Sequence, residues 1–122
     1  MPELIDLKTH TDEKGNLTVI EKVIPFTINR IFYIYGVDES CRGGHRHKTT
    51  VQAAICIQGS CRIINNNGLA TEVFILDKPS RCLILNPEDW HTMDHFSKDA
   101  ILMVLASTEY DPSDYIFTPY SE

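Results

Sequence analysis

The residues best suited to chemistry lie between positions 42 and 48. This run reads Arg-Gly-Gly-His-Arg-His-Lys, so five of its seven side chains are basic or imidazole in a protein of formal net charge −6. If the segment is extended, His45 and His47 point to one face and Arg46 to the other. Two imidazoles on one face can bind a metal ion or exchange protons with a ligand near neutral pH. A solvated basic loop is the alternative without function.

A second histidine group lies near position 90. Trp90 and His91 follow a Pro-Glu-Asp turn, and His95 comes soon after. An indole beside an imidazole can stack on a sugar or nucleobase, or it can fill the end of a barrel. Trp90 and His91 are therefore candidates for substrate binding, with packing as the alternative for Trp90.

Short strands must position these histidines. Strand-like runs occupy residues 17–20, 30–35, 51–58, 61–64, 72–76, 81–85 and 101–105, separated by Gly, Pro, Asn or Asp. Asn67-Gly68 predicts a tight hairpin, because a primed turn requires positive φ. A short helical turn is predicted near 111–114, where Pro112 can take the first helical position. Strands recurring about every 8–12 residues are typical of a sandwich or barrel, so we expect an all-β fold.

Length and composition set further limits. A chain of 122 residues with 23% charged side chains fits one soluble domain, which we expect to span 1–122. The acidic balance gives no support for nucleic-acid or anionic-membrane binding. The N-terminus lacks signal-peptide features, and none of the four cysteines forms a Cys-x-x-Cys pair. We expect a cytoplasmic protein with reduced thiols.

The histidine pair resembles the first motif of the cupin family. The two histidines of that motif correspond to His45-x-His47, its acidic position is occupied by Gln52, and its glycine turn corresponds to Gly59. Residues 79–91 resemble the second motif, which ends in His91. The resemblance implies a cupin, a jelly-roll antiparallel β-barrel. Gln52 stands where metal-binding cupins usually carry glutamate, and a neutral amide is a poorer ligand than a carboxylate for a hard cation. We therefore expect no functional metal.

Four longer runs are similar to the WxcM-like cupins, which include nucleotide-sugar 3,4-ketoisomerases. They are residues 42–48, 58–60, 90–93 and 110–116, and residues 15–21 and 30–35 fit the same pattern. Lys14, in place of an expected arginine, and Ala54, in place of a larger apolar residue, depart from it mildly. The resemblance implies an isomerase that converts a TDP-4-keto-6-deoxyhexose to its 3-keto isomer, in the biosynthesis of 3-amino sugars. It implies no cofactor, and a homodimer with exchanged N-terminal strands.

The resemblance also implies roles for single residues. His45 is expected to be the main proton shuttle, with His47 as its partner, because histidine titrates near neutral pH. Tyr33 is the candidate donor to the enediolate, although Tyr35 has the same parity on its strand. Arg42 is expected to bind the diphosphate, since guanidinium pairs with phosphate bidentately. The remaining substrate-binding candidates are Lys48, Arg30, Trp90, His91 and Gln52.

Three other functions remain open at this stage. A nucleotide-sugar epimerase also begins by removing a proton beside a ketone. A metal-dependent cupin enzyme would contain iron, nickel or zinc. A non-catalytic cupin would bind a nucleotide sugar without turnover.

Overall fold

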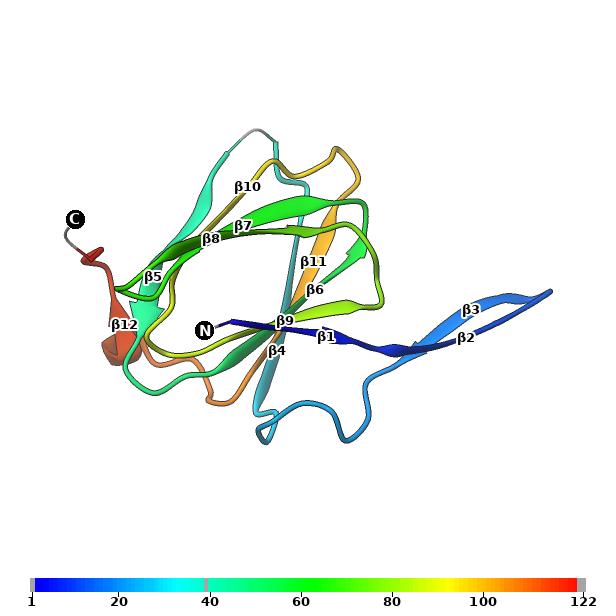
Figure 1. Ribbon diagram of the computed structural model, residues 1–122, viewed down its shortest axis with the longest axis horizontal. Coiled ribbons are helices and arrows are strands. Elements are labelled where there is room, and N and C mark those ends of the chain that lie inside the picture. Colours follow the sequence, from blue (N-terminus) through cyan, green and yellow to red (C-terminus); the bar gives the residue numbers. More distant parts are fainter. Residues whose placement is uncertain (1, 39, 121–122) are drawn as a thin grey trace.

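Two antiparallel five-stranded sheets face each other in the computed structural model, which describes residues 2–38 and 40–120. The first sheet has the order β1-β9-β6-β11-β4 and the second β12-β5-β10-β7-β8. Strands β2 and β3 form a separate hairpin that projects from the barrel (Figure 1). The elements are β1 Glu3–Asp6, β2 Lys8–Asp12, β3 Gly15–Val19, β4 Arg30–Tyr35, β5 Arg42–His47, β6 Gln52–Gln58, β7 Cys61–Asn66, β8 Thr71–Leu76, β9 Arg81–Leu85, β10 Trp90–Asp94, β11 Ile101–Ala106, the 3-10 helix η1 Pro112–Asp114 and β12 Tyr115–Ile116.

The expected all-β jelly-roll barrel is confirmed, and the strands predicted from sequence agree with the observed ones within about two residues. The helical turn predicted near 111–114 is η1. The hairpin at Asn67-Gly68 is also confirmed, but four residues, 67–70, connect its strands. Asn67 Oδ1 accepts hydrogen bonds from the backbone N–H groups of Leu69 and Ala70, which stabilises this longer turn. Positions 1, 39, 121 and 122 of the expected domain lie outside the described residues.

Apolar side chains fill the space between the two sheets. On β7, Cys61, Ile63 and Asn65 are buried and the residue after each of them is partly exposed, which is the alternation of a strand with one face on a core. Burying one such aliphatic side chain contributes about 1.5–3 kcal/mol. This inner cluster includes Ile63, Leu83, Leu85 and Leu102.

The central strand β6 is buried on both faces, which explains its unbroken apolar sequence. Ala54 and Cys56 belong to the inner cluster, whereas Ala53 and Ile55 belong to a second cluster on the outer face of the first sheet. Ile24 and Phe26, from the segment between β3 and β4, pack against that outer cluster, as do Ile5, Ile20, Val51 and Met103. The N-terminal part of the chain therefore acts as a cover for the outer face.

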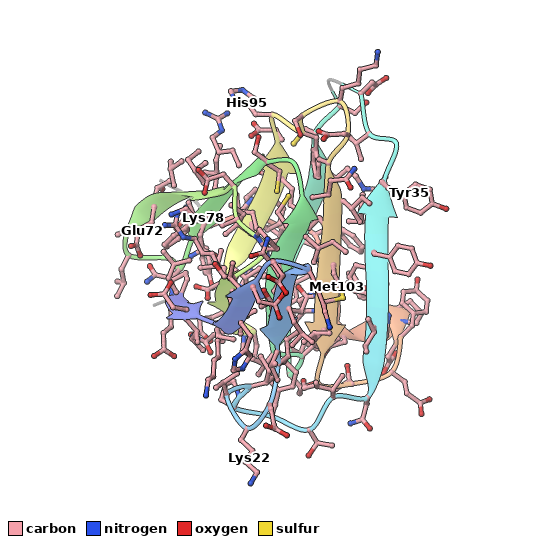
Figure 2. The ribbon with its side chains drawn as sticks, turned by 90° about the vertical axis from the view of Figure 1, so that its right-hand side faces the viewer. Lys22, Tyr35, Glu72, Lys78, His95 and Met103 are labelled. Atoms are coloured by element: carbon pink, nitrogen blue, oxygen red, sulfur yellow. The ribbon has the colours of Figure 1, made fainter. Side chains whose placement is uncertain are left out.

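The cover stops short of strand β4. Tyr33 and Tyr35 are 62% and 67% exposed, and Figure 2 shows Tyr35 projecting from β4 away from the rest of the protein. The barrel thus leaves a mostly aromatic and aliphatic surface open at one edge of the first sheet.

Among the described residues, no helix is long and apolar enough to cross a membrane.

Candidate active site

A pocket of about 300 Å³ lies between the two sheets, at the end where β4, β5, β10 and β12 meet. Six of the residues singled out from the sequence contribute to its wall: Arg30, Tyr33, Arg42, His45, Gln52 and His91. Phe32, Ile34 and Met93 add apolar surface, and Tyr115 closes one side. A concave site in which polar groups converge beside apolar surface is typical of small-molecule binding.

Two glycines shape the strand that carries the histidine pair. Gly43 and Gly44 have φ of +85° and +81°, in the left-handed region that glycine enters without strain. A Cβ on Gly43 would lie 2.9 Å from the carbonyl oxygen of His91, so β5 and β10 approach here as closely as only glycine permits. The pairing of these strands shifts by one residue at this point, from His91 opposite His45 to Thr92 opposite Gly43. Such a bulge re-aims the following side chain, here His45.

Three histidines from the two strands form one cluster. The ring centre of His45 lies 5.0 Å from that of His47 and 5.0 Å from that of His91, in edge-to-face arrangements. The rings of His47 and His91 are 6.4 Å apart and nearly parallel. His45 therefore lies between the other two and is the one of the pair that reaches the pocket wall.

Hydrogen bonds determine which nitrogen of two of these rings carries a hydrogen. Nδ1 of His47 lies 3.0 Å from Oδ2 of Asp114, and Nδ1 of His91 lies 3.1 Å from the backbone oxygen of Asp89. Both partners can only accept, so each Nδ1 donates and each neutral ring keeps its lone pair on Nε2. Nε2 of both rings is buried and makes no hydrogen bond to a described residue.

Burial keeps the cluster uncharged. Desolvation, with the neighbouring His91, lowers the pKa of His45 to about 4. Desolvation likewise lowers the pKa of His91 to about 4, against the opposing hydrogen bond to Asp89. Burial and His45 lower the pKa of His47, although Asp114 opposes this. Three neutral imidazoles near pH 7 can accept protons but do not repel one another.

Tyr115 was not singled out as a site residue, yet it belongs to this cluster. Its ring centre lies 4.8 Å from that of His45 and 4.7 Å from that of His47. Strand β12 brings it there by pairing with β5, which places Tyr115 opposite His47. The residue lies within the run 110–116 that resembles the WxcM-like cupins, so that run carried the available signal.

The structure does not bring the phenol of Tyr33 to the histidines. Tyr33 pairs with Met103, which packs in the outer cluster, whereas the neighbouring Phe32 packs against the inner one. The ring of Tyr33 stacks on that of Tyr35, 5.8 Å away, on the outer face of β4. Tyr33 borders the pocket, but strand alternation turns its side chain to the other face.

Lys48 and Trp90, which were also expected to bind the substrate, are not among the residues of the pocket wall. Lys48 is exposed and follows the last residue of β5. Trp90 precedes His91 on β10, so its side chain points to the opposite face, where its ring lies 4.0 Å from a Cβ built on Gly44.

The two arginines border the pocket from opposite strands. Arg42 is exposed at the start of β5. The guanidinium of Arg30, on β4, lies 4.5 Å from the ring centre of Phe32 and 5.1 Å from that of Tyr110. Two cations at the edge of an uncharged pocket make it suited to an anionic ligand.

The cluster does not fit a metal ion. Within residues 2–38 and 40–120, no three His, Cys, Asp or Glu side chains are arranged to hold one. Gln52, on β6, offers a buried amide oxygen in place of a carboxylate.

Known proteins with similar sequences and structures are nucleotide-sugar enzymes. The family described as "FdtA: WxcM-like, C-terminal" matches residues 1–121. The TDP-4-oxo-6-deoxy-alpha-D-glucose-3,4-oxoisomerase of Aneurinibacillus thermoaerophilus is 43% identical over 117 residues, which are 93% of this chain and 84% of that relative.

Two solved structures extend this similarity to the fold. One is a histidine-to-asparagine variant of the 3,4-ketoisomerase QdtA from Thermoanaerobacterium thermosaccharolyticum in complex with TDP-4-keto-6-deoxyglucose, with 39% identity, a TM-score of 0.92, and 96% of this chain and 87% of that chain covered. The other is WlaRA, a TDP-fucose-3,4-ketoisomerase from Campylobacter jejuni, with 36% identity, a TM-score of 0.89, and coverage of 96% and 89%.

Proposed function

Because the chain belongs to the FdtA, WxcM-like C-terminal family, we propose that it is an isomerase that converts a TDP-4-keto-6-deoxyhexose to the 3-keto isomer. The observation that carries the proposal is the cluster of neutral histidines at the wall of an otherwise uncharged pocket edged by two arginines. The relatives that share 36–43% of the sequence are 3,4-ketoisomerases or oxoisomerases.

The reaction moves a ketone from C4 to C3 of the sugar without an external oxidant. A base removes the proton from C3, which the neighbouring carbonyl acidifies, and the electron pair forms an enediolate across C3 and C4. One proton is then added to carbon C4 and another to the oxygen on C4, while the C3 hydroxyl loses its own proton as its oxygen becomes the ketone. The product has a ketone at C3 and a hydroxyl at C4, so atoms and electrons balance within the sugar and no cofactor is required.

His45 is the group that we assign to this proton transfer, with His47 as its partner. Its place in the pocket wall between two neutral imidazoles supports the role. A pKa near 4 makes His45 a weak base in the free protein. The diphosphate of the bound substrate adds negative charge, which raises the pKa of a nearby imidazole toward the range where a general base is most effective.

Tyr115 is our candidate for the donor that stabilises the enediolate, the role expected of Tyr33. A phenol that shares the pocket with His45 can donate a hydrogen bond to the oxygen on which negative charge develops. Gln52 and His91 complete the sugar subsite from β6 and β10. Arg42, with Arg30, is assigned to the diphosphate, because arginine pairs bidentately with phosphate oxygens.

The protein is further proposed to be a cytoplasmic, single-domain homodimer that exchanges N-terminal strands. The exposed apolar residues on the outer edge of β4, Ile31, Tyr33 and Tyr35, support a second subunit there. The projecting β2–β3 hairpin, with Leu17 59% exposed, supports the exchange. The product would feed an aminotransferase that makes a 3-amino sugar.

Turnover by His45→Asn tests the assignment. The amide approximates the imidazole in size but cannot exchange protons near neutral pH, so the rate should fall by about a hundredfold to ten-thousandfold. Binding of TDP, measured by calorimetry, should stay close to wild type. A variant that keeps more than about half of the wild-type rate would exclude His45 as the base, since the expected loss is far larger. Binding of TDP-sugar without turnover by the wild type would instead indicate a non-catalytic sugar-binding protein.

A further inference from the structure

Asp114 is a buried carboxylate in η1, 67 residues after the histidine that it contacts. Only 7% of its surface is exposed. Burying a charge without partners is costly, so a carboxylate with this little exposed surface must be held by donors.

Five donors converge on Asp114. Oδ1 accepts from the backbone N–H of Thr49 at 2.9 Å and from its hydroxyl at 2.8 Å. Oδ2 accepts from the backbone N–H of Thr50 at 3.3 Å, from the hydroxyl of Thr50, and from Nδ1 of His47 at 3.0 Å. Burial opposes ionisation, but the hydrogen bonds from Thr50, Thr49 and His47 outweigh it and hold the pKa of Asp114 below its usual range.

The position of Asp114 is also set by the backbone around it. Its carbonyl oxygen accepts from the N–H of Lys48 at 2.9 Å, and Asp111 caps η1 by accepting from the N–H of Ser113. The next residue, Tyr115, pairs with His47 in the sheet. Asp114 is therefore hydrogen-bonded to His47, the last residue of β5, and to the three residues that follow it, 48–50, so the positions of the carboxylate and of the histidine are linked.

We infer that Asp114 is a positioning residue for the isomerisation, acting through His47 by fixing that ring with its hydrogen on Nδ1 and its lone pair on Nε2. This inference rests on the proposed function. Nε2 of His47 is buried and makes no hydrogen bond to a described residue. The rings of His45 and Tyr115 pack against this imidazole, at 5.0 and 4.7 Å between ring centres, so His47 lies beside the group assigned to the proton transfer. The arrangement gives His45 a neighbour that accepts a proton and becomes a cation beside an anion.

Several charged or titratable groups face His47, and Asp114 is the anion among those that act on it. They are His45 on its own strand, His91 on β10, Arg30 on β4, Tyr115 on β12 and Asp114 on η1. His45 and Arg30 lower the pKa of His47 and Asp114 raises it. Removing the anion should therefore make His47 a weaker base.

The first test uses the wild-type protein, so that it does not depend on a variant folding. A long-range proton–nitrogen NMR spectrum at pH 7 should show the imidazole hydrogen of His47 on Nδ1 and an unprotonated Nε2. A hydrogen on Nε2 would overturn the inference. This measurement needs no substrate, so its outcome is separate from that of the proposed function.

The second test compares Asp114→Asn with Asp94→Asn. Asp94 is a matched control because it is also a partly buried, bidentate partner, of Arg62, but it lies on the outer face of β10. Asp114→Asn should lower kcat by about a hundredfold or more and move the acidic limb of the kcat/KM profile to lower pH by about one unit or more. Asp94→Asn should leave both unchanged. Loss of activity in Asp114→Asn with an unmoved pH profile would reduce Asp114 to a structural role.

A double variant completes the test. If Asp114 acts only through His47, His47→Asn/Asp114→Asn should turn over within about threefold of His47→Asn, because residues that act as a unit are not additive. Losses that multiply would contradict the inference. If the wild type fails to isomerise the keto sugar, the proposed function fails while the NMR result still decides the tautomer.

Discussion

His91 makes the stability of this protein depend on pH between about pH 4 and pH 6.5. The side chain is 1% exposed, and burial lowers its pKa to about 4 from 6.5. In the unfolded chain the imidazole of His91 takes up a proton below about pH 6.5, whereas in the folded protein it stays neutral until the pH falls to about 4. The folded state therefore loses stability as the pH falls between these two values.

The size of the effect follows from the same two values. A difference of about 2.5 in pKa corresponds to about 3 kcal/mol, of which about 2 kcal/mol is lost between pH 7 and pH 5. His45 and His47, whose pKa values are lowered too, act in the same direction. The paired carboxylates of Asp94 and Asp114 have lowered pKa values, so their contributions are lost mainly at lower pH.

The assay is urea unfolding followed by circular dichroism at pH 7 and pH 5, at one protein concentration. In His91→Asn, the amide can still donate to Asp89 but cannot be protonated, so the loss between the two pH values should be smaller than in wild type by about 2 kcal/mol. His10→Asn, which changes an exposed histidine on β2, is the matched control. Equal losses in wild type and His91→Asn would refute the account of the histidine cluster as neutral and desolvated.

Three further outcomes are expected. Arg42→Ala should weaken binding of TDP by about tenfold to a hundredfold, the worth of a charged hydrogen bond of about 1.5–3 kcal/mol, whereas Lys48→Ala should not; calorimetry that found equal affinities for Arg42→Ala and wild type would remove Arg42 from the diphosphate site. Gly43→Ala should lower the free energy of unfolding by about 1–3 kcal/mol and by more than Gly36→Ala, because a Cβ on Gly36 has no atom within 4 Å; thermal unfolding with equal effects would contradict the close approach of β5 and β10. Turnover should survive dialysis against a chelator, since Gln52 supplies a neutral amide at the pocket; activity lost and then restored by one specific metal would overturn this.

Much of the fold was predictable because its signals are local. The alternation of apolar and polar residues and the turn residues between them predicted the central strands. The continuous apolar run of β6 was also a usable signal, because both faces of that strand are covered. Strands β1 and β2 lacked such a signal, since nearly all of their residues are exposed. They form because they pair with β9 and β3, respectively, and pairing partners are not written in the local sequence.

The site divides in the same way. His45 and His47 were predictable because residues two positions apart on a strand point to the same face of the sheet. Tyr115 and Asp114 were not, because their position depends on β12 pairing with a strand about 70 residues earlier in the chain. Tyr33 was placed incorrectly relative to the histidines because every residue from Ile31 to Tyr35 is apolar or aromatic, so the sequence does not say which parity faces the interior.

The central claim is that the ketone moves, and isotope incorporation tests it most directly. Wild-type protein is incubated with TDP-4-keto-6-deoxyglucose in deuterated water and the sugar carbons are followed by NMR. We expect the carbonyl signal to move from C4 to C3. The histidine cluster delivers a hydrogen to C4 of the product, and this hydrogen is deuterium wherever the transferred proton has exchanged with the solvent. A carbonyl that stays at C4 while deuterium enters C3 or C5 would identify an epimerase and contradict the account.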